Sequence, residues 1–116
     1  MDELLGSLGC KDIDGTKARF MDDKAFYLEI ANELLGESGF EELGDALQRK
    51  DRQAAFDIAH NLKGVIANCG MTPLYECAVK VVDPLRGENP NYQELMVNYA
   101  EFLRQRDIAR NVLGKA

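Results

Sequence analysis

The stretch "DIAHNLKGVIANCG", residues 57–70, contains the only histidine of this 116-residue chain. A helix turns by about 100° per residue, so each position can be placed around the helix axis. Counted in this way, the apolar side chains form one stripe, about 140–240° away from His60. Its members are Ala55, Ile58, Leu62, Val65, Ile66 and Cys69. The pattern therefore predicts a core helix with His60 exposed, and it leaves two interpretations: an ordinary surface histidine and a functional one.

Capping and turn residues on both sides of this stretch predict further helices. Asp51 is a suitable N-cap for the helix that carries His60, and Gly70 is a suitable C-terminal stop. Asp22 is expected to cap an earlier helix, and Ser38 with Glu41 has the spacing of a capping box. The expected helices are residues 23–35, 39–49, 52–69, 72–86 and 91–112, after a short helix at 2–8 and a brief turn at 16–21.

These helices define the expected fold class. No segment alternates apolar and polar residues as a strand does, and the predicted connections are short, which favours antiparallel neighbours. We expect an all-α protein, an antiparallel up-and-down four-helix bundle with a short extra N-terminal helix. It forms a single domain over 1–116, with the core of the bundle at about 22–112. Pro84 is expected to kink or loosen the end of the helix at 72–86.

Composition narrows the function classes. Hydrophobic residues make up 46% of the chain and charged residues 29%, a profile typical of a soluble globular protein. The net charge is −6 without a cluster of Lys and Arg, so nucleic acid is not an expected partner. No apolar run is long enough for a membrane span, and the acidic start does not resemble a signal peptide, so a cytoplasmic location is expected. The three cysteines lack a C-x-x-C pair, so we expect free thiols and no metal site.

The residues that share the face of His60 make the functional interpretation more specific. Lys63 and Gly64 follow it by one turn, Phe56 precedes it by one turn, and Ala67 follows by two. A glycine inside a helix costs about 1 kcal/mol relative to alanine, and packing does not demand one on an exposed face. It clears space around the imidazole, while the lysine offers a cation to an anion bound there. The group is typical of a docking face with a reactive atom at its centre.

Other polar residues nearby are weaker candidates. Gln53 is expected at the border of the docking surface, and Asp57 and Asn61 are candidates for orienting the histidine ring. For all three, the alternative of a solvated surface residue stays open. Lys80 and Arg86 are interpreted as ordinary surface charges.

The run Ala59-His60-Asn61-Leu62-Lys63-Gly64, followed by Gly70, closely resembles the signature of histidine-containing phosphotransfer (HPt) domains of two-component phosphorelays. The similarity extends over about residues 13–86 and includes "LGDALQRKDRQAAFDIAH". It implies that His60 accepts a phosphoryl group from a receiver-domain aspartyl phosphate and passes it to another receiver, with Lys63 stabilising the phosphate. The implied partners are response-regulator receivers and a hybrid histidine kinase. The Mg²⁺ is expected on the receiver, no cofactor on this chain, and the chain is expected to be a monomer.

Two features limit what the resemblance implies. The segment "VVDPLR", residues 81–86, departs from the regular helix usual in the family, which affects partner choice rather than chemistry. The chain has no Gly-rich nucleotide-binding loop, so a phosphoryl carrier is expected rather than an ATP-dependent kinase. The alternative is a receiver-binding adaptor that no longer transfers phosphate. An unrelated enzyme with His60 as general base lacks a predicted nucleophile beside it.

Overall fold

The structure, a computed structural model, describes residues 1–116 and is helical throughout, without a strand. The all-α fold class is therefore confirmed. The elements are α1 (Asp2–Ser7), α2 (Ile13–Arg19), α3 (Lys24–Leu35), α4 (Gly39–Gln48), α5 (Arg52–Asn68), α6 (Thr72–Val82), the 3-10 helix η1 (Asp83–Arg86) and α7 (Tyr92–Gly114). None of these helices combines the length and the apolar character that crossing a bilayer requires.

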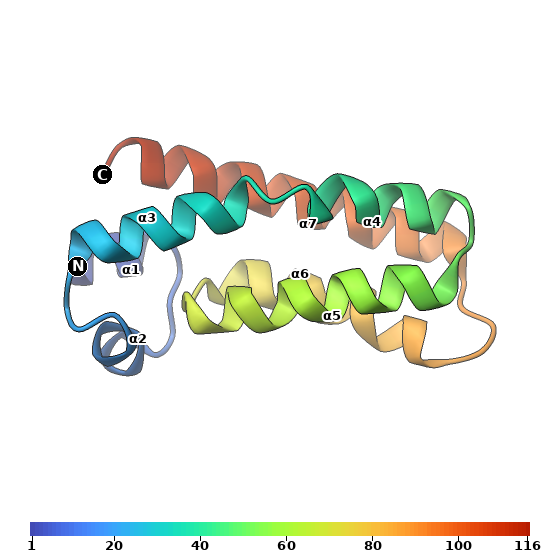
Figure 1. Ribbon diagram of the computed structural model, residues 1–116, viewed down its shortest axis with the longest axis horizontal. Helices are drawn as coiled ribbons and strands as arrows, with labels where there is room; N and C mark the ends of the chain where they lie inside the picture. Colours follow the sequence, from blue (N-terminus) through green and yellow to red (C-terminus); the bar gives the residue numbers. More distant parts are fainter.

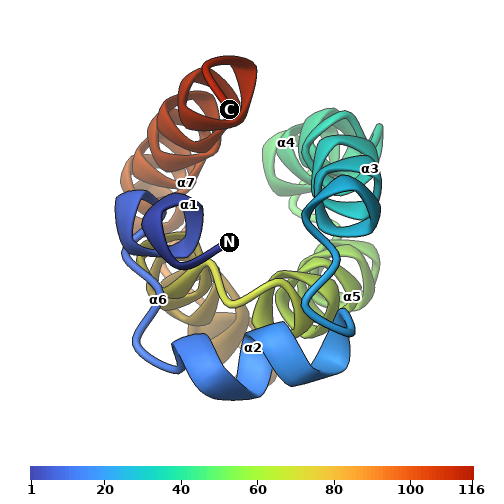
Figure 2. The same cartoon turned by 90° about the vertical axis from the view of Figure 1, so that its left-hand side faces the viewer.

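The helices form an elongated bundle, 42 Å in its longest extent. α3 and α4 follow each other along one side, and α7 runs along the full length beside them (Figure 1). α5 packs between α4 and α6, and α6 packs on α7. Seen along the bundle, α3 with α4, α5, α6 and α7 surround a common core, and α2 lies across one end (Figure 2).

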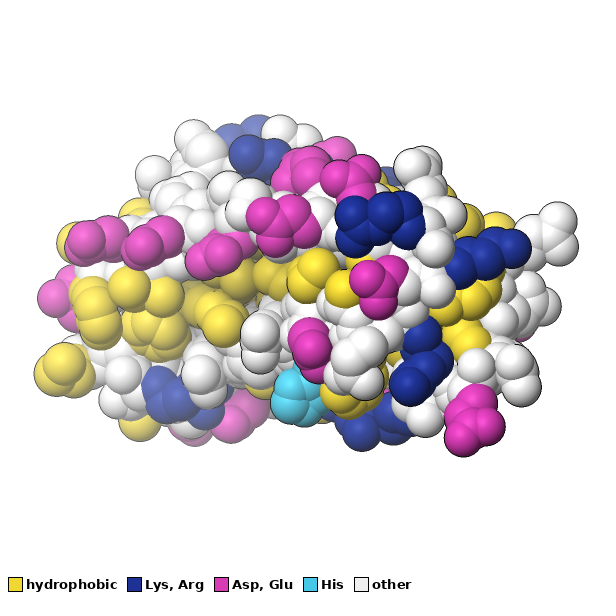
Figure 3. Space-filling view, turned by 45° about the vertical axis from the view of Figure 1, so that its right-hand side comes forward, with side chains coloured by type: hydrophobic (Ala, Val, Ile, Leu, Met, Phe, Trp, Pro, Cys, Tyr) yellow, Lys and Arg dark blue, Asp and Glu magenta, His cyan; other side chains and the backbone are white.

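The core extends further than the predicted range of about 22–112. The short helix α1 contributes Leu4 and Leu5, and Leu113 is buried near the other terminus. Apolar side chains also reach the surface, where they form a band across one face, with the histidine at its edge (Figure 3). Both ends of the chain therefore belong to the packed domain.

The N-terminal segment differs from the prediction. The residues expected as a brief turn form most of α2, because the Asp12 carboxylate accepts a hydrogen bond from the Gly15 amide at 3.1 Å and caps the helix. The cap of α3 is Asp23, whose carboxylate accepts from the Phe26 amide at 3.1 Å. Asp22 was the wrong residue, because it lies at a positive φ of 51° in the turn between the two helices.

The other caps give a mixed outcome. The capping box of Ser38 and Glu41 does not form: the Ser38 side chain donates instead to the Glu42 carboxylate, at 3.2 Å. The Asp51 cap is confirmed, since its carboxylate accepts from the Ala54 amide at 3.2 Å. Gly70 ends the following helix at a φ of 68°, as expected for a left-handed stop.

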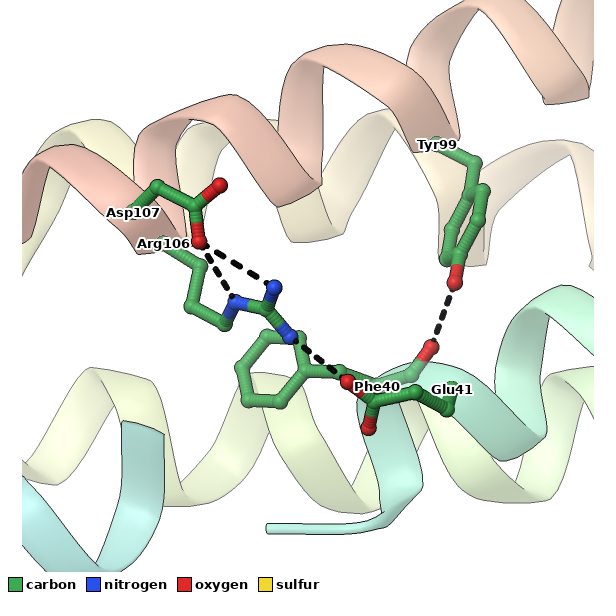
Figure 4. Close-up of polar contacts among 5 residues, drawn as sticks. All are labelled: Phe40, Glu41, Tyr99, Arg106 and Asp107. Atoms are coloured by element: carbon green, nitrogen blue, oxygen red, sulfur yellow. Dashed lines mark hydrogen bonds and ion pairs between the residues drawn. The ribbon is translucent and has the colours of Figure 1, made fainter. Parts of the chain in front are cut away.

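Polar contacts between α4 and α7 hold the two sides of the bundle together (Figure 4). The buried Tyr99 hydroxyl donates to the Phe40 carbonyl oxygen at 2.7 Å. Arg106 is only 9% exposed, and its guanidinium lies 5.2 Å from the centre of the Phe40 ring. It forms ion pairs of 3.1 Å with both Glu41 and Asp107. These contacts satisfy a nearly buried cation and fix α4, on which α5 packs.

Gly44 tests this junction. A Cβ atom at this position would lie 2.9 Å from Cζ of Tyr99 and would also crowd its hydroxyl. We expect Gly44→Ala to lower the free energy of unfolding by about 1–3 kcal/mol, because the ring must move and its buried hydrogen bond is strained. Urea denaturation measures this. The matched control is Gly64→Ala, where an added Cβ meets no atom within 4 Å and stability should stay equal or rise; equal losses in both variants would contradict the account.

Candidate functional site

The buried face of α5 is rotated slightly from the predicted one. The buried residues are Ala55, Ala59, Leu62, Ile66 and Cys69. Val65, expected in the core, is 44% exposed, and Ile58 is only half-buried. Ala59 takes the place of Val65 because its small side chain lets α5 pack closely against its neighbours. His60, near the middle of α5, still points away from the core, so its predicted exposure is confirmed.

The C-terminal end of α5 is held by α2 and α3. The Arg19 Nε donates to the Asn68 carbonyl oxygen at 3.0 Å, and the Tyr27 hydroxyl donates to that of Cys69 at 2.7 Å. These side chains satisfy carbonyl groups that a helix end leaves without partners. Burial raises the pKa of the Cys69 thiol to about 11 and also raises the pKa of Tyr27. Both groups are therefore neutral near pH 7 and act structurally.

The N-terminal end of α5 is tied to η1. The Arg52 guanidinium donates to the Leu85 carbonyl oxygen at 3.0 Å, and the Leu85 side chain is fully buried. The helix α6, which precedes η1, ends at Val82, and the chain continues as the 3-10 turn that contains Pro84. The α-helix thus ends before the proline, short of the predicted residue 86, and its continuation is tightened rather than loosened; the turn packs against the first residues of α5.

The Phe56 ring packs against the His60 ring. Their ring centroids lie 5.5 Å apart with 24° between the planes, which is a stacked geometry. No side-chain hydrogen bond orients the imidazole, because the Asp57 carboxylate accepts instead from the Gln53 amide at 2.9 Å. Asn61 is exposed beside it and makes no side-chain hydrogen bond. Neither Asp57 nor Asn61, the two ring-orienting candidates from the sequence, forms a hydrogen bond with the imidazole.

The surface after His60 is open. Gly64 is exposed, and a Cβ atom there would meet nothing within 4 Å, so packing does not require a glycine. Lys63 is half-buried and forms no ion pair with an acidic residue of the chain. Ala67 is exposed one turn further along. The helix surface one turn after His60 is therefore low, and Lys63 lies on the same helix without an acidic partner.

The structure groups no three His, Cys, Asp or Glu side chains at a spacing that could hold a metal ion. In Figure 3, the histidine stands at the molecular surface beside hydrophobic atoms, with an acidic side chain directly above it and Lys and Arg side chains to one side. The His60 side chain is therefore open to solvent. The class of protein is thus a helical bundle with one exposed histidine on its surface.

The comparison with protein families agrees with this class. The model of the Hpt domain matches residues 28–108, from α3 to α7, and the chain belongs to the Hpt family. Membership indicates a role in the phosphotransfer reactions of two-component signalling. No curated protein and no solved structure matched the chain. α1 and α2 lie outside the matched residues, although α2 holds the end of the helix that carries His60.

Proposed function

We propose that the chain is a histidine phosphotransfer protein, in which His60 accepts a phosphoryl group from a receiver aspartyl phosphate and passes it to another receiver. The observation that carries this proposal is the exposed His60, on a chain of the Hpt family, with open helix surface over Gly64. The antiparallel four-helix arrangement would serve as a rigid support for this one side chain.

The chemistry needs little beyond positioning and charge neutralisation. A lone pair of a neutral imidazole nitrogen attacks phosphorus, the bond from phosphorus to the aspartyl oxygen breaks, and the carboxylate leaves with the electron pair. Because His60 is exposed, the proton on the other ring nitrogen passes to water as the phosphohistidine forms. Lys63, which has no acidic partner in the chain, would stabilise the charge on the transferred group. Attack by the aspartate of a second receiver reverses these steps and regenerates the free histidine.

The proposal also names the partners. They are response-regulator receiver domains, with a hybrid histidine kinase as the source of phosphate, and the Mg²⁺ of the reaction is supplied on the receiver. We place the protein in the cytoplasm as a monomeric carrier without kinase activity of its own, with neither nucleic acid nor membrane as a partner. Gln53, Phe56, Asn61 and Ala67 would contribute to the receiver-docking surface.

The second candidate is an adaptor that binds receivers without transfer, and one experiment separates the two. The chain is incubated with each receiver domain of the source organism after the receiver has been phosphorylated. Transfer predicts that acid-labile phosphate appears on this chain while the receiver loses its label. Stable binding to a phosphorylated receiver without label on this chain would establish the adaptor instead.

Lys63→Ala should slow transfer without abolishing it. Loss of one charge-assisted contact typically costs about 1.5–3 kcal/mol, which corresponds to a rate about 10- to 150-fold lower. Rapid-quench time courses at saturating receiver measure the change. Lys80→Ala is the control, because Lys80 is an exposed lysine on α6 without an ion pair. Equal rates for Lys63→Ala and the parent chain would show that Lys63 is an ordinary surface charge.

A further inference from the structure

The imidazole of His60 has no hydrogen-bonding partner in the chain, yet its ring is one member of an ordered row of side chains. The Phe56 ring stacks on it at 5.5 Å, and the guanidinium carbon of Arg86 lies 5.3 Å from the centre of the same Phe56 ring, inside the range of a cation–π contact. The row therefore runs from Arg86 through Phe56 to His60. It joins the histidine to a different element of the fold.

Arg86 reaches this position because of the 3-10 turn η1. The turn is anchored by the buried Leu85 side chain and by the hydrogen bond from Arg52 to the Leu85 carbonyl oxygen. Asp83, one turn earlier, forms an ion pair with the Arg86 Nε at 3.5 Å and directs the guanidinium. A shallow notch of about 280 Å³ lies here, lined by Arg52, Gln53, Phe56, Leu85 and Arg86. The segment "DPLR", residues 83–86, which departs from the regular helix usual in the family, thus places the cation of Arg86 beside α5.

We propose that Arg86 is a positioning residue for phosphoryl transfer: it holds the Phe56 ring, and that ring holds the imidazole of His60 in the orientation that attacks phosphorus. The inference rests on the proposed function of His60. An exposed side chain without a hydrogen-bonding partner samples several rotamers, and only those that aim a ring nitrogen at the docked phosphoryl group are productive. Because the Phe56 ring contacts both the Arg86 guanidinium and the His60 imidazole, its rotation is restricted. Arg86 is then more than a surface charge.

The first test is structural and needs no transfer reaction. The chain has a single histidine, so its two ring C–H resonances are identified without ambiguity in a ¹H–¹³C spectrum. Phe56→Leu keeps apolar bulk but removes the stacked ring, and it defines the chemical shifts of an unstacked His60. We expect Arg86→Ala to move both resonances toward those of Phe56→Leu, and Arg86→Lys, which keeps a cation, to move them less. Arg110→Ala is the control for loss of one positive charge, because Arg110 is exposed on α7 and has no ion pair.

The second test is kinetic. An exposed cation–π contact corresponds to a factor of about two to five, so Arg86→Ala should lower the transfer rate at saturating receiver by about that factor. The concentration of receiver that gives half the maximal rate should stay unchanged, because orientation rather than docking is lost. In the Phe56→Leu background, Arg86→Ala should have no further effect, since the ring through which Arg86 acts is gone.

Either of two results would overturn the proposal. One is a spectrum of Arg86→Ala in which the His60 resonances stay at their parental positions. The other is the same loss of rate from Arg86→Ala with and without Phe56, which would mean that Arg86 contacts the receiver or the phosphate directly. Failure of the proposed function gives a different result, in which neither the parent chain nor any variant accepts phosphate. The spectra would still show whether Arg86 orders the His60 ring.

Discussion

His60→Gln is expected to abolish phosphoryl acceptance while the bundle stays folded. The carboxamide of glutamine has no nucleophilic nitrogen lone pair, so the covalent intermediate cannot form. The side chain of His60 is exposed and makes no hydrogen bond within the chain, so its replacement removes little packing. We expect the free energy of unfolding to change by no more than about 1 kcal/mol, mainly from loss of the stack on Phe56.

The measurement pairs a transfer time course with thermal unfolding followed by circular dichroism. The label on His60→Gln should remain at background after times at which the parent chain is saturated. Lys80→Ala is a suitable control, because Lys80 is exposed on α6, forms no ion pair and lies outside the proposed docking surface. Acid-labile phosphate on His60→Gln would show that another residue is the acceptor. A collapsed melting transition would contradict the placement of His60 outside the core.

Gly64→Gln is expected to separate stability from transfer. Glutamine favours helix over glycine by up to about 1 kcal/mol, and nothing near this position would obstruct its first side-chain atom. The melting temperature should therefore stay equal or rise. The same side chain would project one turn from His60, into the space that a receiver and its phosphoryl group must occupy. A displacement of the reacting groups by about 1 Å can cost a factor of about 100, and a loss of that order is expected.

Gly64→Ala provides the graded control, because it makes the same gain in helix propensity with a single added methyl group. Its transfer rate should lie between those of the parent and Gly64→Gln. Melting curves and transfer time courses on the three proteins give the two quantities side by side. If Gly64→Gln transfers as fast as the parent chain, the glycine has no part in receiver docking.

The features that sequence predicted well are those set by local periodicity and by single caps. The apolar repeat of α5 was sufficient to place His60 on the exposed side, and Asp51 and Gly70 mark the ends of that helix within one residue. The error within α5 concerns Val65, which is exposed, and Ala59, which is buried. A small side chain such as that of Ala59 carries little hydrophobic weight in a helical wheel. Its burial depends on how closely α5 approaches α4 and α6, which no local pattern contains.

The helical wheel places Val65 in the core and leaves Ala59 out of the apolar stripe, whereas the structure exposes Val65 and buries Ala59. A small residue becomes buried when two helices approach closely, and that approach is decided by the whole bundle rather than by one helix. Sequence periodicity alone therefore finds the exposed side of α5 more reliably than the full membership of its buried side.

The remaining differences come from contacts between residues far apart in the chain. Glu41 was assigned to a capping box, but its carboxylate pairs with Arg106, 65 positions away. The segment of α2 was expected as a turn, although Arg19 reaches the end of α5 and holds it. The sequence indicates only an ordinary surface charge at Arg86, since its contact with Phe56 exists only once η1 has packed on α5. Each of these partners is set by tertiary packing, which local sequence patterns do not describe.

The central claim is that phosphate is carried on His60, and locating the phosphate tests it most directly. The chain is incubated with a phosphorylated receiver and Mg²⁺, digested at neutral to mildly alkaline pH, and its peptides are sequenced by mass spectrometry under conditions that preserve phosphohistidine. The account predicts one added phosphoryl group on the peptide that contains His60, lost on brief treatment with acid. Phosphate on a serine, threonine or aspartate of this chain, or no phosphate from any receiver of the source organism, would contradict it.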